Sequence, residues 1–503
     1  MDRLRPRCSH EVRSARMLIV SWLTLLVLVS GVALAQPSTH VALAWNDLGM
    51  HCMNHWFHTI AVLPPYNNLV GQVILRGYGT IPPHVVTSGL TVEYSIPGNT
   101  YSTGKTDFWD YDVQLFGIDL PLNIGLTGKG LTGVLDPVSG HYIASGIPIT
   151  PYPDATPTTA DPYQQALVIV RDAGGTEVCR SVPVIPVSVE MNCVSSGCHA
   201  SETAILGQHE QVPGFNPNNP PILCAGCHAD PILGTTGIPE AGYFSLRMHA
   251  QHEFIDQEIP GIAGCYKCHP GPQTQCLRGA MNNDFGLICQ DCHGTMGNMA
   301  LTIEGGRIPW MQEPACRSCH TAPYGEPQGQ LFRNSQGHGG VFCSGCHGSP
   351  HAEFPSRVAR DNANAIALQG HAGILRDCRV CHGSTPSAPG PHGYVPTDVV
   401  ESEIVATSAP LRIYPSPVVD GCTIEFAAAV TPDCGTPDSG RLLVFDSQGR
   451  TLRLLRPQLA GDGHWRVRWD ACRADGRRVA PGIYFVRWDE NDRSGAARLI
   501  VAR

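Results

Sequence analysis

The chain has 503 residues, of which 42% are hydrophobic and 15% are charged, and its formal net charge is −9. This length suffices for about three domains, and the composition is ordinary for a soluble exported protein. An acidic surface without basic tracts argues against nucleic acid as a partner.

The first 35 residues have the pattern of a secretory signal peptide. Five arginines precede an apolar run over 17–32, and Ala33-Leu34-Ala35 forms an A-x-A cleavage site. The run is shorter than the roughly 18 to 20 residues of a membrane span, and Gln36 rather than cysteine follows the cleavage site. We therefore expect export without a transmembrane or lipoprotein anchor. Cleavage makes the chain more acidic, because those five arginines outnumber Asp2 and Glu11.

Residues 36–190 are predicted to form an all-β sandwich. Short apolar stretches alternate there with Gly, Pro and Asn turns, as is typical of strands in such domains. The predicted strands cover 41–45, 69–75, 90–95, 142–144 and 166–171.

Between Cys193 and His382, two cysteines are followed at once by histidine seven times. This order attaches c-type haem, because two thioether bonds fix the porphyrin and the adjacent histidine becomes the proximal iron ligand. Zinc ribbons and thioredoxin-like pairs also use Cys-x-x-Cys, but neither requires the histidine. The first motif has four residues between its thiols and the others have two. The motifs, numbered here as sites one to seven, are Cys193/Cys198/His199, Cys224/Cys227/His228, Cys265/Cys268/His269, Cys289/Cys292/His293, Cys316/Cys319/His320, Cys343/Cys346/His347 and Cys378/Cys381/His382.

The region 191–396 offers about 29 residues per expected haem, too few to bury an aliphatic core of its own. It is rich in Gly and Pro and poor in long apolar periodicity. We expect little regular secondary structure, short helices, and seven covalent haems that form the core and lie close enough for electrons to hop between them.

The second axial ligand decides between an electron carrier and an enzyme, because only an iron with an open position can bind a substrate. Seven histidines outside the motifs match the seven irons. His249 and His252 share one face if their segment is helical, and His338, His371 and His392 lie in glycine-containing loops where backbone can approach a macrocycle. The predicted distal ligands are His209, His249, His252, His338, His351, His371 and His392.

Methionine is the rival distal ligand and would raise the reduction potential. The available residues are Met248, Met281, Met296, Met299 and Met311. Lysine ligation is not expected, because the chain has no Cys-x-x-Cys-Lys motif.

After a linker over 397–410, residues 411–503 are predicted to form a small β-sandwich with an immunoglobulin-like fold. Strand-like stretches cover 423–426, 441–445, 451–455, 464–469, 483–488 and 496–501, with turns between them.

Six cysteines lie outside the motifs and the leader, and an even number permits disulfides. They are Cys52, Cys179, Cys276, Cys422, Cys434 and Cys472. A Cys52–Cys179 bond is one hypothesis, although sequence does not fix the pairing. The cluster His51, Cys52, Met53, His55 and His58 suits copper by ligand softness, or could supply one axial ligand; a turn with Cys52 in a disulfide is the plainer alternative.

The haem-binding stretch resembles the bacterial multihaem c-type cytochromes that exchange electrons outside the cell. The similarity is carried by 337–351 and by 369–393, which include Gly337-His338-Gly339-Gly340 and Pro391-His392-Gly393. In that family the additional histidines are distal ligands, which implies this role for His338, His351, His371 and His392. The stretch 46–53 followed by 63–67 resembles a β-rich domain often fused ahead of such arrays.

The C-terminal stretch resembles FlgD-type immunoglobulin-like domains and the related sorting domains of type IX secretion substrates. The similar residues include 413–417, Trp469-Asp470 and 481–485. Ala471 stands where that family usually has glycine, which puts the turn in question. The resemblance implies export to the cell surface or an adhesive module.

Together these features predict a secreted electron carrier with seven haems and bis-histidine ligation, located outside the cell, at its surface or in the periplasm. Its expected partners are other redox proteins or extracellular acceptors. Two alternatives stay open: a multihaem oxidoreductase of small nitrogen or sulfur compounds, which needs one open iron, and a subunit that self-associates into a conductive filament.

Overall fold

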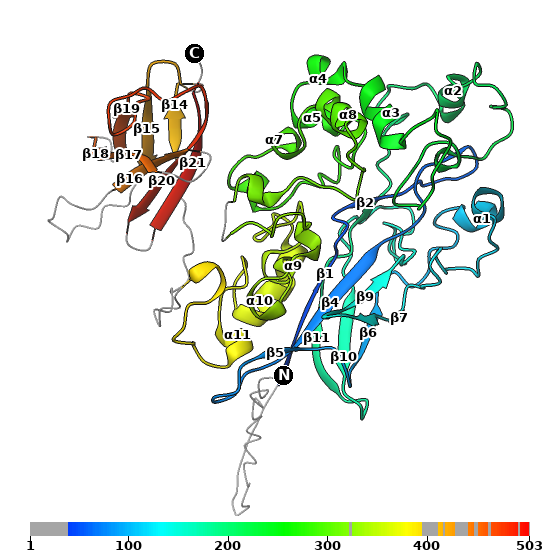
Figure 1. Cartoon of the computed structure of the whole chain (residues 1–503), viewed down its shortest axis with the longest axis horizontal. Coiled ribbons are helices and arrows are strands. Elements are labelled where there is room, and N and C mark those ends of the chain that lie inside the picture. Colours follow the sequence, from blue (N-terminus) through cyan, green and yellow to red (C-terminus); the bar gives the residue numbers. More distant parts are fainter. Residues whose placement is uncertain are drawn as a thin grey trace, which may run out of the picture. The chain divides into compact units, whose positions relative to one another are not determined.

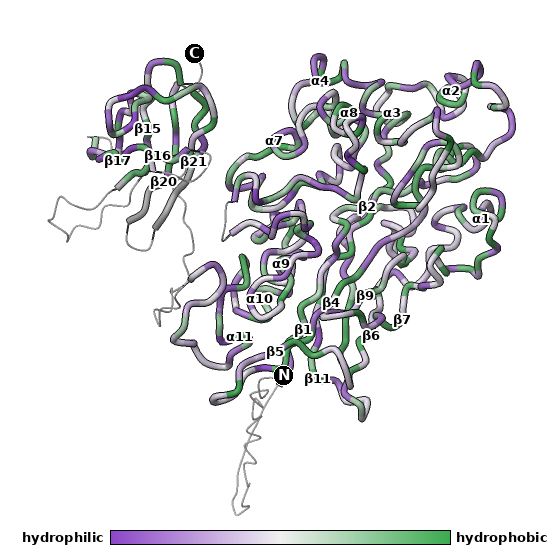
Figure 2. The backbone as a smooth tube through the Cα atoms, in the orientation of Figure 1, coloured by the Kyte–Doolittle hydropathy of each residue, from purple (hydrophilic) through white to green (hydrophobic). Residues whose placement is uncertain are grey.

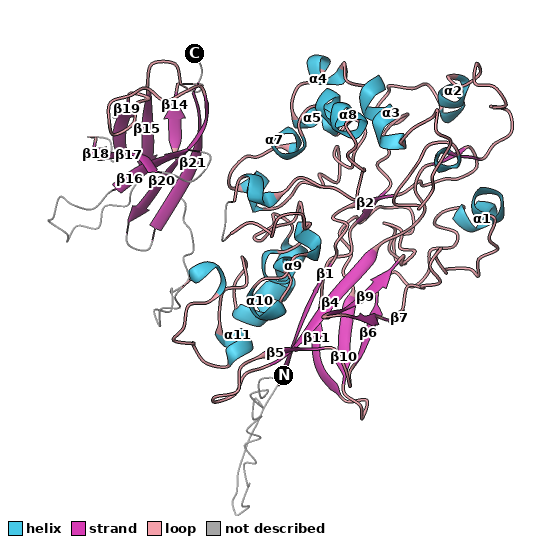
Figure 3. Cartoon of the chain, in the orientation of Figure 1, coloured by secondary structure: helices cyan, strands magenta, loops and turns pink. Residues whose placement is uncertain are grey.

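The computed structural model describes residues 39–320, 324–394, 411–415, 418–427, 441–446, 451–460, 464–490 and 493–501. The predicted leader and linker lie outside these ranges. Along the chain, strands dominate the first and last parts, and short helices and turns make up the middle (Figures 1 and 3). No helix within the described ranges is long and apolar enough to cross a membrane.

Two antiparallel sheets form the first part. One has the order β1 (His40–Trp45), β4 (Asn68–Leu75), β9 (His141–Ser145), β8 (Asp136–Val138), with β5 (His84–Val86) also paired to β4. The other has the order β11 (Glu177–Ser181), β10 (Leu167–Arg171), β6 (Thr91–Ser95), β7 (Gly133–Val134). Val73, Tyr94 and Val170 contribute to one core that both sheets share. The five predicted strands are confirmed to within one residue at each end.

The prediction that this part is all-β is wrong in one respect, because it contains helix α1 (Phe108–Phe116). Phe108 and Trp109 of α1 are buried against Phe57 in a separate hydrophobic cluster. The helix ends at Gly117, whose positive φ of 69° lets its N–H bond to the carbonyl of Val113. Two short parallel pairs were also not predicted: β2 (His51–Cys52) with β12 (Val187–Ser188), and β3 (Ile60–Ala61) with β13 (Ile222–Leu223).

The middle part consists of helices of at most nine residues joined by turns. Hydrophobic and hydrophilic segments alternate over short distances along it (Figure 2). None of the four hydrophobic clusters among the described residues belongs to this part alone. The helices are α2 (Glu202–Gly207), α3 (Phe244–Gln251), α4 (Ile255–Glu258), α5 (Ile262–Cys265), α6 (Ala280–Asn283), α7 (Cys289–His293), α8 (Met296–Glu304), α9 (Cys343–His347), α10 (Ala363–Gln369) and α11 (Arg379–His382), with 3-10 turns η1 (Cys224–Gly226), η2 (Cys316–Ser318), η3 (Phe332–Asn334), η4 (His338–Gly340), η5 (Ala359–Asn362) and η6 (Pro391–Gly393).

Strand β1 is buried on both faces. Ala42 points into the sandwich core, whereas Val41, Leu43 and Trp45 belong to a second cluster that includes Phe342 and Val380 of the middle part. The rings of Trp45 and Phe342 have centroids 5.7 Å apart. A strand covered on both sides has a continuous apolar run rather than an alternating one, which explains the sequence over 41–45. The first sheet is therefore the support on which part of the middle region packs.

A buried glutamine of β4 reinforces this contact. The side-chain N–H groups of Gln72 donate to the carbonyls of Gly140 (2.8 Å) and Gly340 (3.0 Å), and its carbonyl accepts from the N–H of Phe342 (2.9 Å). Gln72 has no exposed surface. It thereby fixes the backbone that follows His338.

A buried ion pair fixes a second segment of the middle part. The guanidinium of Arg278 donates to both carboxylate oxygens of Asp361 (2.7 and 3.0 Å), and the two side chains are 1% and 5% exposed. Arg278 also lies 4.9 Å from the centre of the Tyr163 ring, and its backbone N–H donates to the carbonyl of His351 (2.7 Å). The pair thus joins the first part of the chain to the backbone of a predicted distal ligand.

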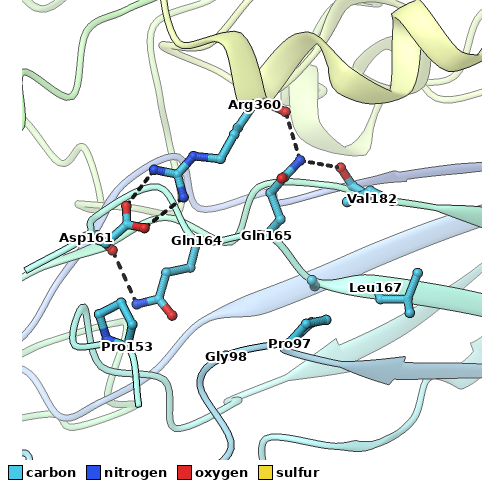
Figure 4. A pocket seen from close by; sticks show the side chains of 10 residues that line it. Pro97, Gly98, Pro153, Asp161, Gln164, Gln165, Leu167, Val182 and Arg360 are labelled. Atoms are coloured by element: carbon cyan, nitrogen blue, oxygen red, sulfur yellow. Dashed lines mark hydrogen bonds and ion pairs between the residues drawn. The ribbon is translucent and has the colours of Figure 1, made fainter. Parts of the chain in front are cut away.

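A neighbouring ion pair is more exposed. Arg360 donates two hydrogen bonds to Asp161 (2.8 and 2.7 Å) across a cavity of about 320 Å³ (Figure 4). The two side chains are 42% and 32% exposed. Gln165, which also lines the cavity, donates to the carbonyl of Arg360 (3.3 Å).

The last part also contains two antiparallel sheets. Their orders are β14 (Arg412–Tyr414), β15 (Cys422–Ala427), β19 (His464–Trp469), β18 (Gln458–Leu459), and β17 (Thr451–Leu455), β16 (Arg441–Asp446), β20 (Gly482–Glu490), β21 (Arg493–Val501). Phe426, Trp469 and Val486 are among the residues of their common core. All six predicted strands are present, and β20 and β21 are longer than predicted because they pair along nine positions. Ala471 forms the turn with a φ of 54°, in the region that favours glycine.

Replacing Gln72 by leucine tests the polar link. We expect Gln72→Leu to lower the free energy of unfolding by about 1–3 kcal/mol, because it leaves buried backbone groups without partners. Urea unfolding of the full chain measures this. Gln114→Leu is the matched control, since Gln114 is exposed and makes one hydrogen bond of 3.2 Å to Pro220. Equal effects of both substitutions would contradict the assignment.

The two ion pairs give a second comparison. Arg278→Ala should lower the free energy of unfolding by about 3–5 kcal/mol, because it leaves the buried carboxylate of Asp361 without its guanidinium partner. Arg360→Ala should cost only about 0–1 kcal/mol, because its pair is solvated. Denaturant midpoints of the two variants distinguish them, and an equal or smaller loss for Arg278→Ala would refute the role given to the buried pair.

Candidate functional site

The attachment motifs fold as tight turns that bring their two ends together. At sites two, three, five and seven, the N–H of the motif histidine donates to the carbonyl of the first cysteine over 2.7–3.0 Å. Sites four and six form the one-turn helices α7 and α9. At site one, His199 donates to Cys193 over 3.0 Å despite the longer spacer, and Gly197 takes a positive φ of 81° within the loop. The four-residue spacer therefore preserves the relation between the ends of the motif.

The two thiols of a motif differ in exposure. The second cysteine of five motifs is exposed in the structure. These residues are Cys198, Cys227, Cys268, Cys292 and Cys319. The first cysteine of each motif is only partly exposed. The polypeptide by itself thus covers one thiol of each of these motifs better than the other.

The second thiol of site one, that of Cys198, contacts the loop that precedes it. The longer spacer forms a loop around Gly197, and the exposed Sγ of Cys198 accepts a hydrogen bond from the hydroxyl of Ser196 (3.3 Å) in that loop. The main-chain closure of site one is therefore like that of the other motifs, whereas its second thiol contacts its own loop. A thioether at Cys198 stays a prediction, and the structure does not bring this thiol into a buried pocket.

Six of the seven motif histidines lie beside a histidine from outside the motifs. The ring centroids are separated by 5.9–6.3 Å, and each pair joins one motif histidine to one predicted distal ligand. The pairs are His199–His252, His228–His209, His269–His249, His293–His351, His347–His392 and His382–His338.

This spacing fits two imidazoles that ligate one iron. A metal–nitrogen bond of about 2.0 Å on each side, with about 1.1 Å from each nitrogen to its ring centre, separates the centres by roughly 6 Å. Ordinary aromatic contacts cover a wider range of about 4.5–7 Å. The one-to-one pairing and the narrow range are what axial ligation requires, so these residues fit the predicted group.

Hydrogen bonds to backbone carbonyls orient three of the distal rings. Nδ1 of His249 donates to Ser245 (2.7 Å), Nδ1 of His252 donates to Met248 (2.8 Å), and Nδ1 of His209 donates to Ile205 (3.3 Å). A carbonyl can only accept, so Nδ1 carries the proton and Nε2 keeps its lone pair. These rings are therefore held in the tautomer that binds a metal through Nε2.

Burial also favours the neutral imidazole, which is the ligating form. Burial, and then the charges of His249 and His293, lower the pKa of His269 to about 4. Burial, and then the charge of its partner His293, lower the pKa of His351 to about 4. Both rings are neutral at pH 7.

Two of the distal histidines take backbone conformations that side chains rarely adopt. His351 has a φ of 67° and His392 a φ of 57°, both in the left-handed region. Such conformations persist only where the surroundings impose them, and they cluster at functional sites.

The segments that contain the predicted distal histidines connect different motifs. Helix α2 begins just after His199 and ends just before His209, so one short segment serves sites one and two. Helix α3 and its C-cap supply His249 to site three and His252 to site one. The segment 338–351 contains motif six and supplies distal residues to sites seven and four.

Contacts between motif residues show which of the remaining sites are neighbours. The thiols of Cys265 and Cys289 are hydrogen-bonded, which joins sites three and four. Partial burial, and then the charge of Cys319, raise the pKa of Cys292, which places site five beside site four. Burial, and then the charges of His392 and His320, lower the pKa of His347, which places site five beside site six. The sites therefore follow the order two, one, three, four, then five and six, then seven.

Sequence matching predicted seven pairs, and the structure departs from this at site five. Within the described ranges, no histidine ring is in ring contact with His320. The remaining predicted distal ligand, His371, hydrogen-bonds through Nδ1 to the carbonyl of Ala372 (2.9 Å) in an exposed loop after α10. The structure thus brings six of the predicted distal histidines beside motif histidines and leaves His371 apart from them, because equality of counts does not determine which residues the tertiary fold brings together.

The five residues considered for copper point to different neighbours. Nε2 of His51 bonds to the carbonyl of Pro64 (2.9 Å), and Met53 is fully buried in the sandwich core. His55 stacks on Trp56 and His58 contacts Asp107 (3.2 Å). Among the described residues no group of three or more His, Cys, Asp or Glu side chains could hold a metal ion. The structure thus gives no support to a shared copper site.

The cysteines outside the motifs are free thiols where they are described, so the suggested Cys52–Cys179 bond is not formed. Burial, and then the charges of Cys193, Glu190 and Cys276, raise the pKa of Cys52. Cys52 therefore lies near site one, whereas Cys179 lies on β11. Cys434 lies outside the described residues.

Comparisons with known proteins add little. No protein family model matches, and no curated protein matches. One solved structure with similarity is PorZ, a bacterial surface component of the type-IX secretion system of Porphyromonas gingivalis; it is 29% identical over 18% of this chain and 11% of its own length, with a TM-score of 0.14. Another is dimeric latent PorU from Porphyromonas gingivalis, 10% identical over 92% of this chain and 34% of its own length, with a TM-score of 0.15. At such TM-scores neither similarity assigns a fold or a function.

The two histidines of the α3 segment allow a direct test of ligand pairing. His249→Ala and His252→Ala should each convert one low-spin haem signal in low-temperature EPR to high spin. Each variant should also bind one more carbon monoxide per chain, when reduced, than the unsubstituted protein, and the double variant should bind two more. His84→Ala, at the exposed first residue of β5, is the control and should change nothing. Unchanged spectra in both single variants would remove these residues from the ligand set.

Proposed function

We propose that this chain is an exported electron carrier that holds seven c-type haems in a connected row. The observation that carries the proposal is the set of six histidine pairs, each with ring centres 5.9–6.3 Å apart. One histidine of each pair belongs to a Cys-x-x-Cys-His motif or to its longer-spaced variant. An imidazole ring on each side of an iron would leave no position for a substrate, which favours electron transfer over catalysis at these sites.

The group that the motifs would bind supplies one-electron redox chemistry, and the chain supplies attachment, orientation and spacing. The fourteen motif cysteines provide thioether links, the motif histidines provide the proximal nitrogens, and six further histidines provide the distal ones. Backbone carbonyls fix the tautomers at His209, His249 and His252.

The shared segments make neighbouring sites mechanically dependent on each other. Helix α3 holds sites one and three at a fixed separation, and the segment 338–351 does the same for sites four, six and seven. Such sharing keeps adjacent sites close, so electrons can pass along the row from site two to site seven.

The sparse aliphatic core supports the same proposal. Helices of at most nine residues, without a hydrophobic cluster of their own in the described structure, need another source of buried apolar surface. Seven porphyrins would provide it, and they would also cover the thiols that the polypeptide leaves exposed, Cys198 among them. The first β-sheet packs against one side of the middle part, where it contacts Phe342 and Val380.

Export is part of the proposal and rests on the sequence. The leader pattern over 1–35 and the covalent attachment chemistry both belong outside the cytoplasm. The C-terminal β-sandwich, which resembles sorting and adhesive modules, suits a protein displayed at the cell surface. The proposed partners are other redox proteins or extracellular electron acceptors.

Removal of individual haems tests the proposed row. Cys289→Ser with Cys292→Ser should remove the haem of site four, in the middle of the row, whereas Cys224→Ser with Cys227→Ser should remove that of site two, at its end. Both proteins should retain six haems by pyridine haemochrome. The current through single molecules held between electrodes should fall much further for the mid-row variant. Equal currents in both variants would contradict a single continuous path.

A further inference from the structure

Site five differs from the other six sites in its histidine environment. Every histidine of the chain except His10 of the leader lies in the described ranges. Six pairs use twelve of the fourteen predicted ligands, and within those ranges His320 and His371 contact neither each other nor any other histidine ring. At each of the other six sites the motif histidine contacts one predicted distal histidine. Within the described ranges, the missing histidine contact is therefore specific to site five.

His371 is held in a different place. Its ring bonds to the adjacent carbonyl of Ala372 (2.9 Å), and Gln369 donates to the carbonyls of His371 (3.2 Å) and Ile374 (3.1 Å), which closes the loop on itself. The loop then continues to Leu375, whose N–H donates to Cys346 of site six (2.9 Å). These contacts fix the loop beside site six.

Three glutamates lie near the first cysteine of site five. Burial, and then the charges of Glu326, Glu353 and Glu313, raise the pKa of the Cys316 thiol to about 12. Glu326 is buried and accepts from the backbone N–H of Arg317 (3.1 Å). The surroundings of this thiol are therefore acidic.

The cations near these glutamates offset their charge only in part. Arg333 pairs with Glu313 (3.3 Å). Burial raises the pKa of Glu353, and the charge of Arg278 opposes this shift, although Arg278 forms its own ion pair with Asp361. The side chains described around the Cys316 thiol are therefore mainly acidic. Acidic surroundings oppose the approach of an anion more than that of a neutral molecule.

We propose that site five keeps an open axial position opposite His320 that binds a small neutral ligand of the carbon monoxide or nitric oxide class. This inference rests on the proposed haem attachment and adds to it. Because site five lies beside sites four and six, the bound molecule contacts the row at its middle, where the row can sense or exchange electrons with it.

Titration of the reduced full-length protein with carbon monoxide tests the inference, with haem content measured in parallel by pyridine haemochrome. We expect seven haems and one carbon monoxide per chain. His371→Ala should leave this uptake at one, and His392→Ala should raise it to two by opening site six. Cys316→Ala with Cys319→Ala should lower the haem count to six and the uptake to zero.

The outcomes separate the two proposals. Seven haems with no uptake, gaining one carbon monoxide in His371→Ala, would show that His371 closes site five and would overturn the inference while leaving the electron carrier intact. Uptake that persists after removal of Cys316 and Cys319 would place the open iron elsewhere and also overturn it. If the double cysteine variant does not fold, the comparison of His371→Ala with the unsubstituted protein still decides. A haem count of zero would instead overturn the proposed function itself.

Discussion

Pairs of imidazole rings about 6 Å apart are the interaction on which, in our account, the middle of this protein depends. The chain brings together histidines far apart in sequence, such as His293 and His351. Burial, and then the positive charge of His293, lower the pKa of His351, so a protonated pair would repel. A shared metal would replace this repulsion by two coordinate bonds. In our account, the helices of the middle part are short because the cofactors, and not helix-to-helix contacts, determine where each segment lies.

The first β-sheet complements this arrangement by giving the sites a fixed support. Strand β1 has one face in the sandwich core and the other against Phe342 and Val380, so the sheet and the later motifs cannot move independently without exposing apolar surface. Gln72 and the Arg278–Asp361 pair add directional contacts to the same boundary. They act on the segments that carry His338 and His351. The β-rich part thus controls the geometry of sites to which it contributes none of the paired histidines.

Much of this organisation could be predicted from sequence, because the signals are local. Alternating apolar stretches indicate the strands of both sandwiches, and the motif by itself specifies two thiols and one proximal ligand. The distal ligands were predicted as a set, yet their assignment depends on tertiary structure: nothing local indicates that His338 lies beside His382 while His371 lies beside no motif histidine. The exposure of Cys198 could not be predicted for a similar reason, because the motif specifies the thiol but not what surrounds it.

Two features of the first part were also beyond local signals. Helix α1 was missed because its apolar residues pack against Phe57, from a distant segment. The burial of strand 41–45 on both faces could likewise not be predicted, since a continuous apolar run does not indicate which segment packs on its second face.

The central claim, that the motif cysteines carry covalent haem, is tested most directly by the intact mass of the exported protein made with a functional haem-attachment system. Our account predicts a mass that exceeds the polypeptide by seven haem groups, with site one modified like the others despite its longer spacer. Unmodified thiols at the motifs, or zinc in place of haem, would contradict it.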